Sequence, residues 1–147
     1  MGVSGKGSVE ITQKIQAPAE SVAAYISDFR NAKEWMVGVH GVERLSEDEY
    51  RLLLETPAGN LEPHVRVVEH SDGRICWIYT SLIEGGGWVE VRPLEDGGSL
   101  VSYRGEFRLK SRVLDRAARL VGLERFARLN GERSLTRLRY IMEARRY

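Results

Sequence analysis

Residues 9–35 read VEITQKIQAPAESVAAYISDFRNAKEW, and this stretch decides the fold. In its first part the apolar residues Val9, Ile11 and Ile15 alternate with polar ones. A two-residue period is typical of a half-buried strand. We therefore predict a strand over residues 8–16, with one face turned inward.

The second part of this stretch has helical spacing. Pro18 suits the first turn of a helix, apolar side chains recur every three to four residues up to Asp28, and a second helical turn carries Trp35 and Met36. Helices this short are unstable alone, so they must pack against another element. The end or the open edge of a curved sheet offers such a surface.

After Gly38, glycine-containing turns separate strand-like segments. We expect turns at residues 57–60, 71–73, 85–87 and 96–98, and an antiparallel meander of six strands between and around them. The predicted strands include 49–56, 61–69, 88–94 and 101–109. In the last of these, Val101, Tyr103 and Phe107 share one face. We also expect the glycines at 85–87 to form a mobile loop at the edge of a cavity mouth.

The C-terminal third has helical periodicity over residues 111–121 and again over 123–146, with Gly122 between them. We predict one long helix that is broken once. Asn130-Gly131 lies inside it and costs about 1 kcal/mol relative to alanine, which makes this the place for a kink or a second break.

Composition and charge limit the class of protein. The 147 residues fit one domain (1–147, with 1–7 as a flexible tail), and a chain of this size buries about two-thirds of its surface. One cysteine and three histidines predict no disulfide framework, no metal site and no cofactor. No apolar run predicts a signal peptide or a membrane span, so we expect a cytoplasmic protein.

The charge is unevenly distributed along the chain. Residues 104–147 hold 13 Lys or Arg against 5 Asp or Glu, whereas residues 1–103 hold 9 against 16. A basic helix can bind nucleic acid, acidic lipid or an acidic partner, but these arginines alternate with apolar residues at helical spacing. We interpret them as a solvated helix face, with no specific nucleic acid as a partner.

With its elements in this order, the chain resembles the START-like, Bet v 1-like (SRPBCC) superfamily, and within it the bacterial polyketide cyclase/dehydrase-like proteins. The resemblance rests on residues 9–35, on DGGSLVSYRGEF (residues 96–107) and on the terminal helix. It implies an α+β helix-grip fold: a curved antiparallel sheet of about seven strands (β-α-α-β6-α) wraps around the long C-terminal helix, and two short helices close one end. That fold hosts lipid carriers, cyclases, hydrolases and stress proteins.

One helix cannot fill a sheet this curved, which predicts an apolar cavity of a few hundred cubic ångströms. An empty void costs about 24 cal/mol per Å³, so a cavity that persists is expected to have a use. For each predicted lining residue, ordinary core packing is the competing interpretation. These residues are Tyr25, Trp35, Tyr50, Leu52, Leu54, Val65, Val67, Val89, Val91, Tyr103, Phe107, Phe126, Leu138 and Met142.

Few polar residues are candidates for catalysis. Tyr79 and Tyr103 are each able to direct a hydroxyl into the cavity, as orienting groups. His64 is the third candidate, but the alternation of its strand places it on the outer face. Cys76 has no histidine partner in the sequence and is expected to be inert. The sequence contains no nucleophile elbow, paired carboxylates or cofactor fingerprint.

Two functions remain open from the sequence. The first is binding, transport or sensing of a hydrophobic small molecule such as a lipid, polyketide or isoprenoid. The second is an aromatase/cyclase that folds a poly-β-ketone chain in the same cavity. A partner module that uses the basic helix face is a third interpretation, and we expect a monomer or a weak homodimer.

Overall fold

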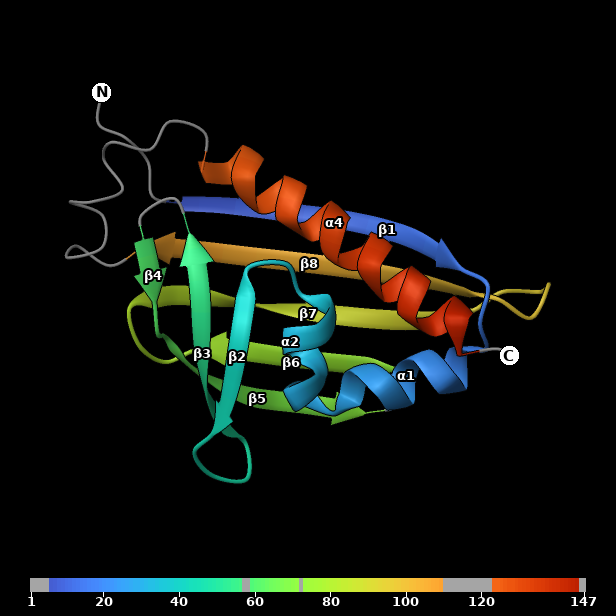
Figure 1. Cartoon of the computed structure of the whole chain (residues 1–147), viewed down its shortest axis with the longest axis horizontal. Helices are drawn as coiled ribbons and strands as arrows, with labels where there is room; N and C mark the ends of the chain where they lie inside the picture. The colour runs from blue at the N-terminus through green and yellow to red at the C-terminus, as the bar shows by residue number, and fades with distance from the viewer. Residues whose placement is uncertain (1–5, 57–58, 72, 110–122, 146–147) are drawn as a thin grey trace.

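A curved antiparallel sheet frames the molecule in a computed structural model that describes residues 6–56, 59–71, 73–109 and 123–145. The strands are β1 Lys6–Ile15, β2 Val39–Arg44, β3 Glu49–Thr56, β4 Gly59–Leu61, β5 His64–Ser71, β6 Arg74–Tyr79, β7 Ile83–Pro93 and β8 Ser99–Leu109. Seven of them are hydrogen-bonded in the order β1, β8, β7, β6, β5, β3, β2, and β4 pairs with β3 outside this path. In Figure 1, β2 and β3 run across the direction of β5 to β8, so the sheet is strongly curved.

Helices cover the inner side of this sheet. They are α1 Ala19–Ser27, the 3-10 helix η1 Phe29–Asn31, α2 Ala32–Trp35 and α4 Leu123–Ala144. The long α4 crosses in front of β8 and β1 (Figure 1), whereas α1 packs against β7 and β6, and α2 packs against β2 and α4. This arrangement confirms the predicted helix-grip α+β fold. No helix in the described ranges is both long and apolar enough to span a membrane.

Seven strands follow the short helices, where six were predicted. The segment predicted as one strand over 61–69 is divided into β4 and β5 at Pro63, which has no N–H to donate to a strand ladder. The Pro63 carbonyl instead accepts a hydrogen bond from the Leu52 N–H at 2.9 Å.

The first strand pairs with the last along its whole length. The register runs from Lys6 opposite Arg108 to Ile15 opposite Ser99. Lys6 and Gly7, which were predicted to belong to a flexible tail, are therefore part of β1, because β8 is long enough to pair with them.

The prediction of a mobile glycine loop is wrong. Gly85, Gly86 and Gly87 lie inside β7, which is hydrogen-bonded to β6 on one side and β8 on the other. A Cβ added to Gly86 would lie 2.0 Å from the Trp77 carbonyl oxygen, and one added to Gly85 would lie 2.2 Å from that of Glu106. These glycines allow neighbouring backbones to approach closely, which is a different use of the residue from flexibility.

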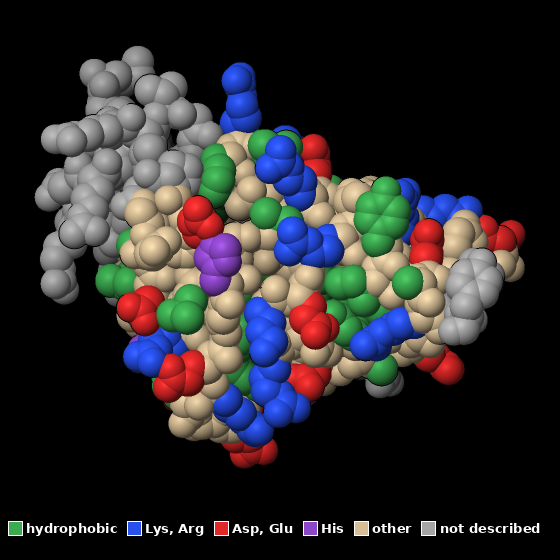
Figure 2. Space-filling view, viewed as in Figure 1, with side chains coloured by type: hydrophobic (Ala, Val, Ile, Leu, Met, Phe, Trp, Pro, Cys, Tyr) green, Lys and Arg blue, Asp and Glu red, His purple; other side chains and the backbone are tan. Residues whose placement is uncertain are grey.

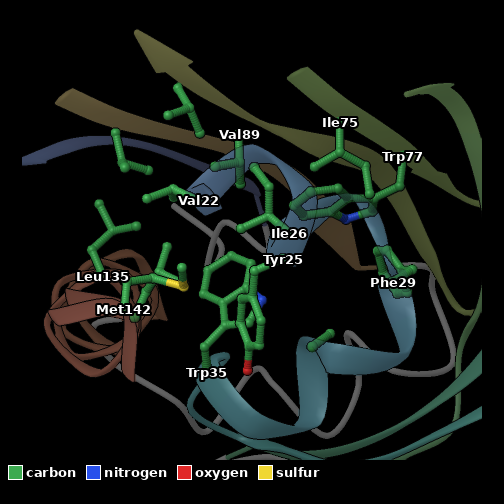
Figure 3. Close-up of a cluster of buried hydrophobic side chains, with 14 of the residues drawn as sticks. Val22, Tyr25, Ile26, Phe29, Trp35, Ile75, Trp77, Val89, Leu135 and Met142 are labelled. Atoms are coloured by element: carbon green, nitrogen blue, oxygen red, sulfur yellow. The ribbon is translucent and has the colours of Figure 1, made fainter. Parts of the chain in front are cut away.

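The core lies between α1, α4 and the inner face of the sheet. Figure 3 shows Leu135 and Met142 extending from α4 toward Val22 and Trp35. All four side chains are at most 3% exposed and belong to one cluster.

The described part of the C-terminal helix, α4, is continuous through Asn130-Gly131, so no break occurs there. A Cβ on Gly131 would lie 2.5 Å from Cδ1 of Ile11, so this glycine lets α4 lie directly on β1. The predicted helix over residues 111–121, and its interruption at Gly122, lie outside the described residues.

Candidate functional site

A cavity of about 180 Å³ lies between α4, the short helices and one end of the curved sheet. The sheet contributes mainly apolar and aromatic side chains: Leu52, Leu54, Leu61, Trp77, Tyr79, Ile83, Tyr103 and Phe107. The opposite wall comes from Phe29, Trp35, Met36, Phe126, Ala127, Asn130, Gly131 and Ser134. Residues 37–39, Glu55 and Thr56 complete the lining.

Glycines at inward positions of the sheet make room for two aromatic rings of the cavity lining. Gly87 of β7 is opposite Gly105 of β8, and neither carries a side chain into the concave face. A Cβ on Gly87 would lie 2.6 Å from Cζ2 of Trp77, and one on Gly105 would lie 2.7 Å from the Tyr103 hydroxyl. The two aromatic rings therefore lie over the glycines, with centroids 6.4 Å apart, and form the floor of the cavity.

A capping interaction in the opening sequence stretch positions the Phe29 ring. The Asp28 carboxylate accepts a hydrogen bond from the Arg30 backbone N–H at 3.1 Å, and its two oxygens accept from the Arg30 guanidinium at 3.0 and 2.9 Å. These bonds to Arg30 hold the pKa of Asp28 below its ordinary value. The cap begins η1 and turns Phe29 inward, where its ring packs edge-on against Trp77 at 5.7 Å.

Two phenols are the main polar groups inside the cavity. Burial raises the pKa of both Tyr79 and Tyr103 above the ordinary value, and the nearby Tyr79 raises that of Tyr103 further. Both hydroxyls stay protonated at neutral pH, so they are able to donate hydrogen bonds to an oxygen atom of a ligand.

The mouth of the cavity is a junction of three elements. Ser134 of α4 accepts a hydrogen bond from the Val37 N–H at 2.8 Å and donates one to the Asn130 carbonyl at 2.6 Å. Gly38 has a φ of 93°, and a Cβ there would lie 3.2 Å from Asn130 Nδ2 and 3.3 Å from the Glu55 carbonyl oxygen. The loop after α2 is thus held between α4 and β3.

Six of the predicted lining residues surround this cavity: Trp35, Leu52, Leu54, Tyr103, Phe107 and Phe126. Eight others do not, namely Tyr25, Tyr50, Val65, Val67, Val89, Val91, Leu138 and Met142; they lie in the packed core. The reason is that α1 packs against β6, β7 and β8 and fills that end of the concave face. Inward orientation along a strand therefore does not by itself indicate contact with the cavity.

Tyr25 has a structural role in this core. Its hydroxyl donates a hydrogen bond to Glu34, and the Arg145 guanidinium lies 4.7 Å from the centre of its ring. Burial, followed by the bond to Glu34, raises the pKa of Tyr25 above its ordinary value.

Of the three predicted catalytic candidates, the structure brings together Tyr79 and Tyr103 but not His64. His64 flanks the inward Val65 in β5, so its side chain is on the other face of the sheet. Cys76 is half-buried between the inward positions of β6, and burial raises the pKa of its thiol. Sequence reasoning missed Phe29 and Trp77 as lining residues, although the alternation of Ile75, Trp77 and Tyr79 places Trp77 on the inward face.

Residues 6–143 match the family described as "Polyketide cyclase / dehydrase and lipid transport". The chain belongs to this family. Membership confirms the resemblance to polyketide cyclase/dehydrase-like proteins, and the description of the family covers both cyclase/dehydrase and lipid transport roles. No curated protein sequence matches the chain significantly.

Solved structures are similar to this member of the polyketide cyclase/dehydrase and lipid transport family. A START superfamily protein from Mycobacterium smegmatis has a TM-score of 0.77 at 17% identity, over 93% of this chain and 97% of that one. The Zhui aromatase/cyclase from Streptomyces sp. R1128 also has a TM-score of 0.77 at 17% identity, and the match covers 97% of this chain and 96% of that one. A Deinococcus radiodurans protein has a TM-score of 0.61 at 25% identity, and the match covers 83% of this chain and 97% of that one. At 17% identity, the first two likenesses show the fold alone.

Proposed function

We propose that this protein binds a hydrophobic small molecule, such as a lipid, polyketide or isoprenoid, in the cavity over Trp77 and Tyr103, and acts as its carrier or sensor. The observation that carries the proposal is the lining of the cavity: apart from the two phenols, the only titratable side chain among the described lining residues is Glu55. A site with apolar walls and a few hydrogen-bond donors suits binding and orientation of such a ligand.

The raised pKa values of the two phenols and the exposed position of Glu55 favour binding without turnover. General acid–base catalysis works best when the pKa of the group lies near the working pH. The pKa values of Tyr79 and Tyr103 are shifted upward, away from neutrality. Glu55 is exposed and lies against His40, outside the apolar part of the cavity.

An aromatase/cyclase activity is the second candidate, and the closeness of Tyr79 and Tyr103 favours it. Two protonated phenols at one place are suited to polarise a carbonyl of a poly-β-ketone chain and so to assist ring closure. In this candidate the same cavity folds the substrate, and the phenols act by hydrogen bonding.

Ligand-induced stabilisation tests whether the cavity binds. At a hundredfold excess over the dissociation constant, a ligand that binds only the folded state adds about 2.7 kcal/mol. For a chain of this size, that raises the melting temperature by roughly 5 to 10 °C. The panel to test comprises fatty acids, flavonoids, isoprenoids and aromatic polyketides.

Two neighbouring positions in β3 provide a matched control. Leu54 lines the cavity, whereas Leu53 is 40% exposed on the other face. Leu54→Trp should fill the cavity and abolish the shift, and Leu53→Trp should leave it unchanged, with circular dichroism to check that both variants fold. An equal shift in both variants, or no shift with any member of the panel, argues against the proposed cavity function.

Tyr79→Phe and Tyr103→Phe separate the two candidates, because each removes a hydroxyl and keeps the ring. If binding persists while turnover of a poly-β-ketone falls by about a hundredfold or more, the cyclase is the correct candidate. If the parent protein turns over no such substrate, the carrier or sensor is favoured.

A further inference from the structure

The cavity is too small to contain a typical ligand by itself. Sites for small molecules usually measure about 300–1,000 Å³, and a void of about 150 Å³ holds a single benzene ring. The cavity here measures about 180 Å³. A ligand larger than one ring or a short chain must therefore extend beyond the apolar walls.

An open groove of about 590 Å³ continues the cavity outward. The two share residues 37–39, Glu55, Thr56, Phe126 and Asn130, so a molecule that fills the cavity has the groove as its way out. The groove is bounded by α2, β2, β3 and α4, on the face seen in Figure 2, where several Lys and Arg side chains gather.

The groove differs from the cavity in its charge. Besides the shared residues it is lined by Lys33, Arg133, Arg137 and His40. Arg133 and Arg137 are four residues apart on α4, which places them on the same face of the helix. We call Lys33, Arg133 and Arg137 the basic rim.

Carboxylates near the basic rim do not neutralise it. Glu55 is the one carboxylate among the described residues that line the groove, so the three basic-rim cations outnumber it, and Glu34 accepts the Tyr25 hydroxyl. Glu132 lies beside Arg133 and Arg137 on the outer side of α4. Within the described ranges, no carboxylate lies within 4.0 Å of a basic-rim nitrogen.

We infer that the ligand of this cavity is an amphiphile with an anionic end, a carboxylate or a phosphate, which the basic rim binds while the apolar body enters the cavity. This inference rests on the proposed function, because it adds a binding site for the ligand's head group, the groove, to the apolar cavity. Cations that converge on one groove attract an anion, and Arg provides paired N–H donors that match carboxylate and phosphate oxygens.

Matched ligands test the inference. Decanoic acid, decyl phosphate, methyl decanoate and decanol share an apolar chain and differ in the charge of the head group. Calorimetric titration at low salt should give the acid or the phosphate a dissociation constant about tenfold below that of the ester and the alcohol, since exposed ion pairs contribute modestly. Whichever anion binds more tightly identifies the head group. Added salt should reduce this preference.

Two double variants with equal loss of charge identify the residues. Arg133→Gln/Arg137→Gln removes two rim cations, whereas Arg125→Gln/Arg128→Gln removes two exposed cations of the same helix outside the groove. The first should abolish the preference for the anion and keep binding of the ester; the second should retain the preference. Circular dichroism and the melting temperature show whether both variants fold.

If neither the acid nor the phosphate binds the parent protein more tightly than the ester and the alcohol, the inference is overturned and the proposed function stays intact. The same holds for an anion preference that survives Arg133→Gln/Arg137→Gln. Failure of all four probes to bind would count against both the inference and the proposed function.

Discussion

Replacing Trp35 by alanine should destabilise the protein strongly, because this side chain is buried in the main core cluster. Trp35 is 2% exposed. A tryptophan buries about 150–250 Å², which at about 25 cal/mol per Å² corresponds to roughly 4–6 kcal/mol. That area estimate is an upper bound, and Trp35 also lines the cavity, so part of its surface has no packing contacts to lose. We expect a loss of about 3–4 kcal/mol in the free energy of unfolding.

Urea unfolding followed by far-UV circular dichroism measures this loss without depending on tryptophan fluorescence. The melting temperature should fall by roughly 10 °C. Trp88→Ala is the control, since Trp88 is half-buried in β7 and lies 5.1 Å from the Arg74 guanidinium, away from the cavity lining. A loss below about 1 kcal/mol for Trp35→Ala, or an equal loss for both variants, would refute the reasoning that Trp35 holds the short helices in place.

Three further predictions follow from the site. Gly87→Ala should cost about 1–3 kcal/mol and reduce ligand-induced stabilisation, because the added Cβ would lie 2.6 Å from the Trp77 ring; urea unfolding and thermal shift measure the two effects. Asp28→Ala should cost about 0.5–1 kcal/mol at pH 7. Because the folded-state pKa of Asp28 is lowered, this cost should start to shrink as the pH falls below about 4 and disappear below the folded-state pKa, and an undiminished cost at pH 3 would contradict the assignment. The folded-state pKa of Tyr25 is raised, so its phenol contributes stability below about pH 10 that is lost at higher pH; melting temperatures from pH 8 to 11 should fall less steeply for Tyr25→Phe than for the parent.

Local pattern was sufficient to predict most of the fold. The alternation in residues 101–109 fixed the inward face of β8, since a slip by one residue would expose Val101 and Tyr103. Local pattern was not sufficient at Gly85–Gly87. A run of glycines is typical of a flexible turn, but it also occurs in a strand whose neighbours approach its backbone closely. Only the neighbouring strands β6 and β8 distinguish the two cases.

The candidate site was harder to predict than the fold. Alternation indicates which face of a strand points inward, but not how far along the strand a helix fills the space. Val89 and Tyr103 have the same inward orientation, yet Val89 is fully buried in the core and Tyr103 lines the cavity. The basic rim was missed for a related reason: Lys33 is about a hundred residues from Arg133 and Arg137, and only the position of α4 across the sheet brings them to one groove.

The pairing of β1 with β8 has a consequence for synthesis of the chain. Ile15 emerges from the ribosome well before its partner Ser99, and at about 5–20 residues per second the interval is roughly 5–20 s. During that interval Val9, Ile11 and Ile15 have no strand to pair with. The growing sheet lacks β8, and it lacks β1 as well, because β1 joins the sheet only through β8. The nascent chain therefore exposes an unpaired apolar strand until β8 is made, and the sheet is completed only once Leu109 has been translated.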